Sequence, residues 1–460
     1  MPSHVFTNRT LNLKKITHIG LDMDHTLVRY HSENFESLSH SLIVKKLIED
    51  KKYPETLRKL KFDFNLAIRG LVIDRHKGNL LKLNRYGAIR NSYHGLKPLD
   101  FKTQKQVYRS KYIDLSTGEY LAIDTAFSIS NAVLYAQIVE LKETDTAHRY
   151  PDYSIIADDV LEMLDEAHRD GSLKSEVRKN LDHYIIKDAS VALGLERFKK
   201  HGKKIFIVTN SDYGYTKLLM DYAVTPFLKE HSSWTDLFEY VVTFAQKPKF
   251  FMQKANFLKV DPATGSLTNY DRPLEPGIYQ GGCATKFTAD LNLDGDDILY
   301  IGDHIYGDIL RLKKDCNWRT AMVIDELAEE IAANEKAAPA MNEINRLMRE
   351  KEPLEEELTQ MLTDRIDHPE SKANDKRINQ LQEQISDLDT ELSQHIKKQL
   401  SHYNAHWGPI MRTGNEESFF AYQLDRYACV YMSKLSDLLE LSPRNYFRAP
   451  RRPLSHEVEE

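Results

Sequence analysis

The sequence predicts an α/β fold, built on an open and largely parallel sheet with two inserted segments. Short apolar runs rich in β-branched residues end in polar clusters at 16–24, 203–211, 239–247, 297–304 and 320–324. Such runs are typical of strands buried on both faces of a parallel sheet. Helical patterns lie between the later runs, so strand and helix alternate along the chain. Two long stretches, at about 31–185 and 325–402, do not follow this alternation.

The first strand, at 16–24, is followed by the first of these stretches. It mixes helical with extended segments and is long enough to form an inserted domain. The alternation resumes with a helix over 191–202, which Gly202 would end before the next strand. We therefore expect a catalytic core and an inserted substrate-specificity cap, with the core made of 1–30, 186–324 and 403–460 and the cap of 31–185.

The second stretch, 325–402, is dense in Glu, Lys, Gln and Leu. Its later half has apolar residues at steps of three and four, which predicts a narrow stripe on a charged helix: Ile378, Leu381, Ile385, Leu388, Leu392 and Ile396. The earlier half has a similar rhythm, and the polar segment DHPESKAND separates the two, so we expect an antiparallel helical hairpin. Its charged flanks suit either packing within the chain or a contact between subunits of a homo-oligomer, a dimer or a tetramer.

Composition and charge exclude several classes of protein. The 460 residues include 63 Lys plus Arg against 69 Asp plus Glu, a net charge of −6, which gives no overall basic field for nucleic acid. No apolar run approaches the roughly 20 residues that span a bilayer, and the N-terminus lacks the apolar region of a signal peptide. The three cysteines are odd in number and far apart, which is typical of a reducing compartment. We therefore expect a cytoplasmic protein that binds neither nucleic acid nor membrane.

Polar residues stand where four of the predicted strands end. Asp22 and Asp24 follow the first strand, Thr209-Asn210-Ser211 the second, Lys247 the third, and Asp303 and Asp308 the fourth. Parallel strands bring their carboxyl ends to one edge of the sheet, so these side chains should gather there. Crowded carboxylates raise one another's pKa unless a cation neutralises them, and oxygen ligands favour Mg²⁺. We expect Asp22, Asp24, Asp303 and Asp308 to bind that ion.

The same edge carries groups that suit a phosphate. Thr209, Asn210 and Lys247 supply a hydroxyl, an amide and a cation, so metal and phosphate sites coincide and phosphoryl transfer is the expected reaction. Asp22 is the candidate nucleophile, and Asp24 is the candidate general acid and base. Each motif taken singly also fits an ordinary turn, a helix N-cap or a surface lysine. Their shared order and strand context favour catalysis.

With these motifs the sequence resembles phosphatases of the haloacid dehalogenase (HAD) superfamily. The phrases DMDHTL, TNSDYGYTK, QKP, DILYIGDHIYGDIL and RYACVYMSKLSDLL are similar to one branch of it, the cytosolic purine 5′-nucleotidases that prefer IMP and GMP, from about residue 17 to 450. The resemblance implies a Rossmann-like sheet with strand order 5-4-1-2-3 and a cap inserted between the first two motifs. It also implies Mg²⁺-dependent hydrolysis of purine ribonucleoside monophosphates, with transfer of the phosphoryl group to a nucleoside as a side activity.

The resemblance extends to residues of the cap. Phe127 matches the aromatic residue that stacks on the purine, and the other matches to base-contacting and nucleotide-contacting positions are Asp165, His168 and Lys174. Asp165 and His168, three apart, would share one helical face. Without the resemblance, Phe127 would be read as a core aromatic and His168 as a surface histidine. Leu161 stands where the family has an arginine directed at the base, which leaves the preferred purine open.

The resemblance also implies a second site, for a purine nucleotide effector. Matches to its lining are Lys314, Gln423, Arg426 and Tyr427. Asp114 stands where the family has an arginine, and the loss of a basic residue from a polyphosphate pocket would alter or abolish activation.

Two other functions stay open at this point. One is a phosphomonoesterase of the same fold that acts on another small phosphorylated metabolite. The other is a non-catalytic interaction protein that uses the 325–402 hairpin. The intact pair Asp22 and Asp24 favours an enzyme, because a scaffold need not keep it.

Overall fold

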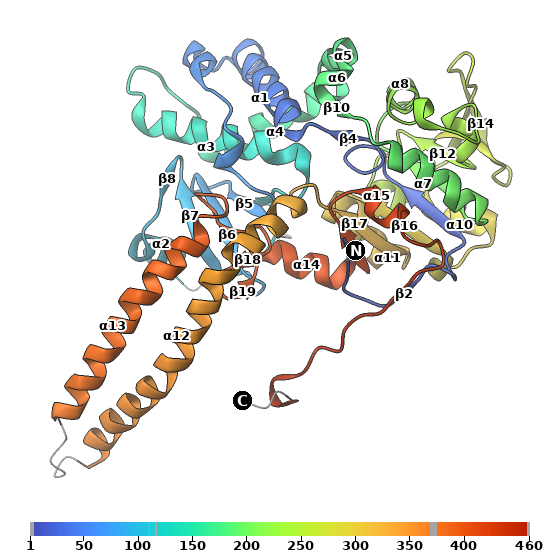
Figure 1. Cartoon of the computed structure of the whole chain (residues 1–460). Helices are drawn as coiled ribbons and strands as arrows, with labels where there is room; N and C mark the ends of the chain where they lie inside the picture. Colours follow the sequence, from blue (N-terminus) through green and yellow to red (C-terminus); the bar gives the residue numbers. More distant parts are fainter. Residues whose placement is uncertain (1–3, 110, 116, 369–374, 458–460) are drawn as a thin grey trace. The chain divides into compact units, whose positions relative to one another are not determined.

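The computed structural model describes residues 4–109, 111–115, 117–368 and 375–457 (Figure 1). The chain folds into two compact units. The first comprises Met1–Asp325 and Ile410–Glu460, and the second is Glu326–Pro409.

The first unit is built on a ten-stranded sheet of the order β1-β20-β17-β16-β3-β11-β12-β15-β13-β14. Its parallel strands are β20 (Val430–Met432), β17 (Arg319–Val323), β16 (Ile298–Gly302), β3 (His18–Leu21), β11 (Lys204–Val208), β12 (Tyr240–Thr243) and β15 (Gly277–Gly281). Antiparallel strands complete its edges, namely β1 (Val5–Thr7), β13 (Phe257–Val260) and β14 (Leu267–Tyr270). The predicted α/β class and the order 5-4-1-2-3, here β17-β16-β3-β11-β12, are confirmed.

Both faces of this sheet are buried. Ile205 and Ile207 of β11 belong to one apolar cluster, whereas Phe206 and Val208 belong to the other. The alternation explains why the strands appear as continuous apolar runs in the sequence. Gly20, in the central strand β3, is required by packing, because a β-carbon there would lie 2.4 Å from the Phe206 ring.

Helices join the strands of this core. They are α7 (Ala189–Lys200), α8 (Tyr213–Ala223), α9 (Lys249–Met252), α10 (Ala284–Leu291), α11 (Arg311–Asp315), α14 (Phe419–Tyr427) and α15 (Leu435–Leu439). The helix predicted over 191–202 is α7, and Gly202 follows it with φ +79°. Two small antiparallel pairs are β2 (Leu11–Asn12) with β21 (Tyr446–Phe447), and β18 (Arg412–Thr413) with β19 (Glu416–Glu417).

The segment between β3 and β11 leaves and rejoins the core through a short stem. In this stem β4 (Arg29–Tyr30) pairs antiparallel with β10 (Ile185–Ile186). The helices beyond it are α1 (Ser32–Glu49), α2 (Phe101–Tyr108), α3 (Ile129–Thr144), α4 (Tyr153–Arg169), α5 (Ser172–Lys179) and α6 (Leu181–Tyr184). An antiparallel five-stranded sheet accompanies them, comprising β5 (Leu71–Asp74), β6 (Asn79–Leu83), β7 (Ile89–His94), β8 (Lys97–Pro98) and β9 (Tyr120–Ala122).

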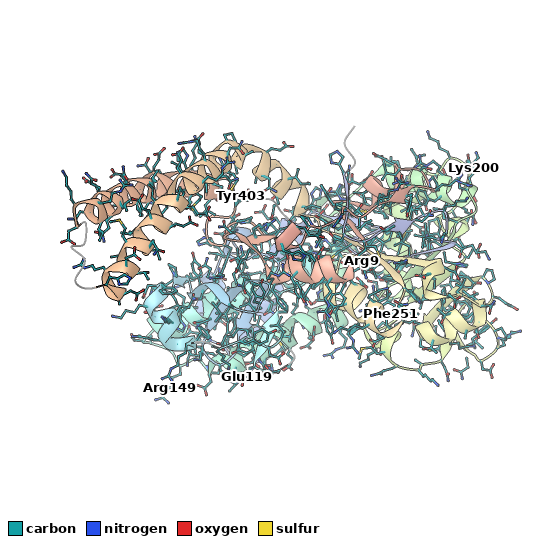
Figure 2. The ribbon with its side chains drawn as sticks, turned by 90° about the horizontal axis from the view of Figure 1, so that it is seen from below. Arg9, Glu119, Arg149, Lys200, Phe251 and Tyr403 are labelled. Carbon is teal, nitrogen blue, oxygen red and sulfur yellow. The ribbon has the colours of Figure 1, made fainter. Side chains whose placement is uncertain are left out.

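Helix α3 lies at the centre of this inserted segment. Its residues from Ile129 to Val139 are all buried, and α1 and α4 pack against it and against each other (Figure 1). Glu119 and Arg149 mark the outer surface of the same segment in Figure 2. The segment therefore has a core of its own, and we call it the cap.

The second unit is a pair of helices, α12 (Leu327–Asp367) and α13 (Asp375–Leu400), which lie side by side (Figure 1). Leu347 of α12 and Ile378, Leu381 and Leu392 of α13 are buried, whereas Ile396 is exposed. Ion pairs flank this stripe, with Lys351 Nζ 2.7 Å from Asp389 Oδ1 and Arg377 Nη2 2.6 Å from Glu357 Oε2. The turn expected between the helices falls mainly on 369–374, outside the described residues. No described helix combines the length and the apolar character needed to cross a bilayer.

Candidate functional site

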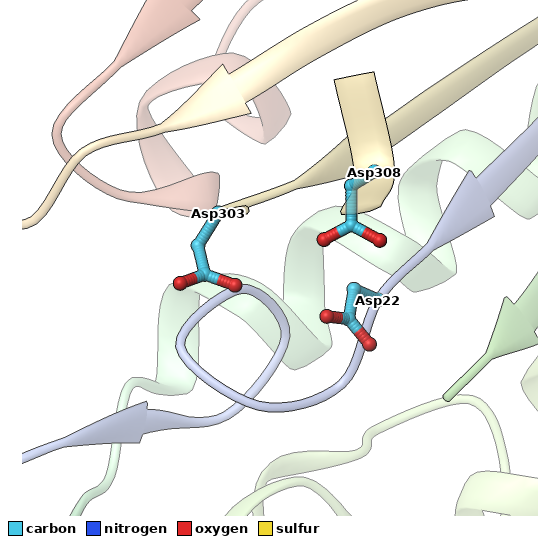
Figure 3. Close-up of side chains that lie close together, drawn as sticks. All are labelled: Asp22, Asp303 and Asp308. Atoms are coloured by element: carbon cyan, nitrogen blue, oxygen red, sulfur yellow. The ribbon is translucent and has the colours of Figure 1, made fainter. Parts of the chain in front are cut away.

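Three carboxylates lie together where two neighbouring strands of the core end. Asp22 follows β3, while Asp303 and Asp308 follow β16, which pairs with β3. Each offers an oxygen within 4.8 Å of the other two, and all three residues are buried (Figure 3). Gly302 permits this approach, because a β-carbon at 302 would lie 2.5 Å from that of Asp308. We call Asp22, Asp303 and Asp308 the acidic cluster.

Lys247 enters the acidic cluster from the loop after β12. Its Nζ lies 2.7 Å from Asp22 Oδ1 and 2.7 Å from Asp308 Oδ1, and donates to the Tyr300 hydroxyl at 3.1 Å. Asn210 holds this loop in place: its side chain accepts from the Lys247 main-chain nitrogen at 2.6 Å and donates to the Lys247 carbonyl at 3.1 Å. Lysine and amide therefore lie at one edge with the carboxylates, as the sequence predicts for a phosphate site.

The protonation of these groups shows a shortage of positive charge. Burial raises the pKa of Asp303 to about 7, and Arg69 offsets only part of that effect. Burial also raises the pKa of Asp22 well above its ordinary value, against the opposing charge of Lys247. For Lys247, burial would lower the pKa, but Asp22 and Asp308 raise it well above its ordinary value, so the amine stays charged. The acidic cluster with Lys247, fully ionised, would carry a net charge of −2, which the nearby Arg69 guanidinium offsets in part.

One divalent cation would supply the positive charge that the acidic cluster lacks. The cluster offers carboxylate oxygens alone, with neither thiolate nor imidazole, and hard oxygen ligands suit Mg²⁺ rather than a softer metal. Asp22, Asp303 and Asp308 would hold the ion. The carboxylate of Asp24, which we expected as a fourth ligand, does not belong to this group of three.

Asp24 is instead held by two hydroxyl groups. Tyr30 donates to its Oδ1 at 2.6 Å, and Ser211 donates to its Oδ2 at 2.9 Å. Burial raises the pKa of Asp24, and these two hydrogen bonds oppose the rise. Asp22 and Asp24, two residues apart, therefore have different surroundings, one facing carboxylates and a cation and the other facing hydroxyls.

Thr209 is fully buried, and its hydroxyl accepts from the Ser211 main-chain nitrogen at 3.1 Å. It is not among the residues that line the cavity described next, whereas Asn210 and Ser211 are. The structure therefore brings Asn210 and Lys247 to the open part of the site and leaves Thr209 beneath it.

A cavity of about 670 Å³ opens over the acidic cluster between core and cap. Its walls include all three carboxylates of the cluster, Asp24 and Lys247 from the core. The cap contributes all four residues that the family resemblance singles out, Phe127, Asp165, His168 and Lys174. The residues that face this one space thus come from positions 22 to 308 of the chain.

Aromatic rings form the cap side of this cavity. The Phe127 ring packs edge-on against His25 at 4.4 Å, Phe35 at 5.1 Å and His168 at 5.6 Å between centroids. Burial, with the nearby charge of Lys174, lowers the pKa of His168 to about 4, so this imidazole is neutral at pH 7. A flat apolar ligand would meet a ring surface and a neutral imidazole here.

Two further cap residues lie at this cavity. Lys174 Nζ pairs with Asp212 Oδ2 at 2.7 Å and lies 5.1 Å from the centre of the Tyr215 ring. Asp212 caps the start of α8, so Lys174 connects the cap to a core helix. Burial raises the pKa of Asp165, and Arg169 opposes that rise.

Several residues of the site are absent from our sequence predictions. Tyr30 donates to Asp24, Tyr215 lies beside the Tyr30 hydroxyl, and Arg169 lines the cavity, whereas Leu161 does not appear among its lining residues. Arg69 is almost fully buried and donates through Nη1 to the Asp303 main-chain carbonyl at 2.9 Å. Ser211, which we expected at this edge together with Thr209 and Asn210, donates to Asp24.

The residues expected to bind an effector lie elsewhere in the first unit. Lys314 Nζ and the guanidinium carbon of Arg426 lie 5.6 Å and 5.5 Å from the centre of the Tyr427 ring. Gln423 lies one turn before Tyr427 on α14. The structure therefore gathers at least Lys314, Arg426 and Tyr427.

Comparison with known proteins gives one family. The model of the 5′ nucleotidase family matches residues 5–459. A 5′-nucleotidase domain-containing protein of Dictyostelium discoideum is 29% identical over 466 residues, covering 99% of this chain and 75% of that protein. The 5′-nucleotidase domain-containing protein 2 of Rattus norvegicus is 29% identical over 484 residues, covering 99% and 80% respectively.

Solved structures are more distant. A HAD phosphatase from Thermococcus onnurineus is 12% identical, with a TM-score of 0.25 over 67% of this chain and 87% of that one. A likeness of this size adds nothing to the assignment.

Proposed function

The chain belongs to the 5′ nucleotidase family and is a 5′-nucleotidase, and from this premise we propose that it is a Mg²⁺-dependent enzyme that hydrolyses purine ribonucleoside 5′-monophosphates, IMP and GMP, through an aspartyl-phosphate. The observation that carries the proposal is the cavity that joins the acidic cluster and Lys247 to Phe127 and His168. Its volume of about 670 Å³ lies within the usual range for small-molecule sites.

The chemistry follows from the two environments of Asp22 and Asp24. Asp22 would attack the phosphorus, beside Lys247, which would neutralise charge that develops on the phosphoryl oxygens. Mg²⁺, when bound to the acidic cluster, would supply further positive charge at the same place. Asp24 would protonate the leaving 5′ oxygen and then remove a proton from the water that hydrolyses the aspartyl-phosphate.

The cap would recognise the nucleoside. Phe127 is suited to stack on the base, and neutral His168 and Asp165 are suited to bond its edge. Lys174 is suited to contact the nucleotide near Asp212. A nucleoside 5′-hydroxyl could replace water in the second step, which would give phosphotransferase activity.

The substrate profile tests this function. IMP, GMP, AMP and small sugar phosphates should be compared by kcat/KM, and we expect IMP and GMP to be preferred. Phe127→Ala should lower kcat/KM for the nucleotides about tenfold or more, because base stacking on an aromatic ring contributes about 1–3 kcal/mol, and should change the sugar phosphates little. Equal activity on every substrate in the wild type would contradict the nucleotidase claim.

We also propose a purine nucleotide effector at Lys314, Gln423, Arg426 and Tyr427. Two cations beside the Tyr427 ring suit a base and its phosphates. Nucleoside triphosphates should change the substrate saturation curve, and an unchanged curve would remove this site from the account.

Assembly and location complete the proposal. The helix pair of the second unit is proposed as the contact of a homo-oligomer, a dimer or a tetramer. A variant that lacks the pair should form an assembly with fewer subunits in solution. An unchanged number of subunits would assign the pair to packing within the chain. The three cysteines, Cys283, Cys316 and Cys429, are free thiols, which suits the cytoplasm.

A further inference from the structure

Both oxygens of the Asp24 carboxylate are engaged by hydroxyl groups from separate elements. Tyr30, in the stem strand β4, donates to Oδ1 at 2.6 Å, and Ser211, just before α8, donates to Oδ2 at 2.9 Å. The Tyr30 hydroxyl also lies 3.2 Å from the hydroxyl of Tyr215, on α8. Both tyrosines are buried, with 2% and 3% of their surface exposed.

The direction of these bonds follows from the number of hydrogens. Tyr30 has a single hydroxyl hydrogen, and it donates this hydrogen to Asp24 Oδ1. The bond between the two tyrosines must then be donated by Tyr215. The result is an ordered chain, Tyr215 to Tyr30 to Asp24, that begins at two buried tyrosines.

Residues of the substrate cavity surround this chain. The Tyr30 ring stacks on His25 at 4.8 Å with 22° between planes, and meets the Phe127 ring edge-on at 6.0 Å. Lys174 Nζ lies 5.1 Å from the centre of the Tyr215 ring. Tyr30 also belongs to the stem, where it is paired with Ile185. Its position is thus determined by both core and cap.

We propose that Tyr30 is a positioning residue that fixes the Asp24 carboxyl toward the leaving oxygen of the substrate, and that Tyr215 orients Tyr30. The proposal rests on the proposed function of Asp24. Ser211 holds the second oxygen, so the two hydroxyls together restrict rotation of the carboxyl about its Cβ–Cγ bond. Removing the Tyr30 hydroxyl leaves Asp24 in place but frees this rotation.

The step that depends on this orientation is proton transfer. As Asp22 Oδ bonds to phosphorus, the bond from phosphorus to the ester oxygen breaks, and that oxygen takes the proton of the Asp24 carboxyl. An alkoxide, such as a nucleoside 5′ oxygen, needs this proton, whereas p-nitrophenolate leaves without it. In the second step Asp24 takes a proton from water, the water oxygen bonds to phosphorus, and the bond to Asp22 breaks.

The test is Tyr30→Phe, which keeps the ring and removes the hydroxyl. Single-turnover formation of nucleoside from IMP should slow about tenfold to a hundredfold, the effect expected for a lost hydrogen bond to a carboxyl that becomes charged as it gives up its proton. The burst of p-nitrophenolate from p-nitrophenyl phosphate, which reports the first step alone, should stay within about twofold of the wild type because that step needs no acid. KM for IMP should not change. Tyr215→Phe should act in the same direction and less strongly.

Tyr53→Phe is the matched control. Tyr53 is also a buried tyrosine that donates to a carboxylate, Asp159 Oδ2 at 2.9 Å, but both residues lie in the cap and neither lines the cavity. It should leave both rates unchanged.

Two results would overturn the proposal. One is an unchanged rate with IMP in Tyr30→Phe, and the other is an equal loss with IMP and p-nitrophenyl phosphate, which would mark a structural role. If the wild-type enzyme gives the p-nitrophenolate burst but does not turn over nucleotides, the proposed nucleotide substrate is refuted and the proposed role of Tyr30 is not. The Tyr30 comparison then uses a sugar phosphate, whose leaving group is also an alkoxide.

Discussion

At the scale of single residues, the acidic cluster is the candidate metal site. Lys247 pairs with two of the three buried carboxylates, Asp22 and Asp308, and burial raises the pKa of the third, Asp303, to about 7. A divalent cation removes this electrostatic cost, and its binding must therefore also stabilise the fold.

We predict that Mg²⁺ alone raises the midpoint of thermal unfolding of EDTA-treated protein. At a Mg²⁺ concentration of about a hundred times Kd, the free energy of unfolding should rise by about 2.7 kcal/mol. Asp303→Asn should abolish this rise, and Asp165→Asn, also in the cavity but outside the cluster, should keep it. Asp24→Asn tests separately whether Asp24, the fourth ligand that we expected from the sequence, contributes to Mg²⁺ binding. A full Mg²⁺-induced rise in Asp303→Asn would contradict the assignment of the cluster.

A second residue-scale prediction concerns Glu36, which lies between two helices of the cap. Its Oε2 accepts from the Ser130 main-chain nitrogen at 2.5 Å, and burial raises its pKa from an ordinary value of 4.5 to about 7. The folded state therefore prefers the protonated form. Stability from this group is complete below pH 4.5 and is lost as the pH rises to about 7.

Glu36→Gln should consequently stabilise the protein at pH 8 by up to about 3 kcal/mol and have no effect at pH 4.5. Urea unfolding at the two pH values measures this difference, because glutamine keeps the acceptor for Ser130. The same change in unfolding free energy at both pH values would show that Glu36 titrates normally.

Polar residues at the ends of apolar strands are the part of the site that a sequence can predict. Asp22, Lys247, Asp303 and Asp308 each follow such a strand, and parallel pairing then brings them together. Tyr30 could not be predicted in this way. Its stem strand has two residues, and the partner of Tyr30 in the pair is Ile185, far along the chain.

At the scale of elements, the sheet of the core could be predicted from the sequence, whereas the central helix of the cap could not. The sheet order followed from the family resemblance and is confirmed by β17-β16-β3-β11-β12. The residues of the cap helix α3 from Ile129 to Val139 are all buried. The sequence therefore shows no alternation of apolar and polar faces from which this helix could be predicted. On α4, Arg169 lines the cavity, whereas Leu161, two turns earlier, is not among the lining residues.

The helix pair α12 and α13 provides an element-scale prediction. Leu381 is fully buried within the pair, so Leu381→Ala should cost about 2–5 kcal/mol and increase hydrogen exchange throughout α12 and α13. Glu383→Ala, at an exposed position of α13, is the control. Unchanged exchange in Leu381→Ala would mean that the apolar stripe does not hold the helices together.

At the scale of the whole molecule, two parts of one unit meet at the cavity that we propose as the active site. The core contributes Asp22, Asp24 and Lys247, and the cap contributes the aromatic wall around Phe127. Neither part alone contains both the groups for phosphoryl transfer and the groups that would bind a nucleoside. Substrate binding and chemistry should therefore be separable by substitution, with cap changes acting on specificity and core changes on every substrate.

The most direct test of this account is to identify the residue that carries the phosphoryl group. The enzyme with Mg²⁺ and IMP is quenched in acid during turnover, and its peptides are examined by mass spectrometry for a phosphoryl group that hydroxylamine removes. We predict the modification on Asp22 in the wild type, and its absence together with turnover in Asp22→Asn. In Asp24→Asn it should accumulate when p-nitrophenyl phosphate replaces IMP, because p-nitrophenolate leaves without an acid while hydrolysis of the intermediate slows. Phosphate release by Asp22→Asn at the wild-type rate, or modification of another residue, would contradict the account.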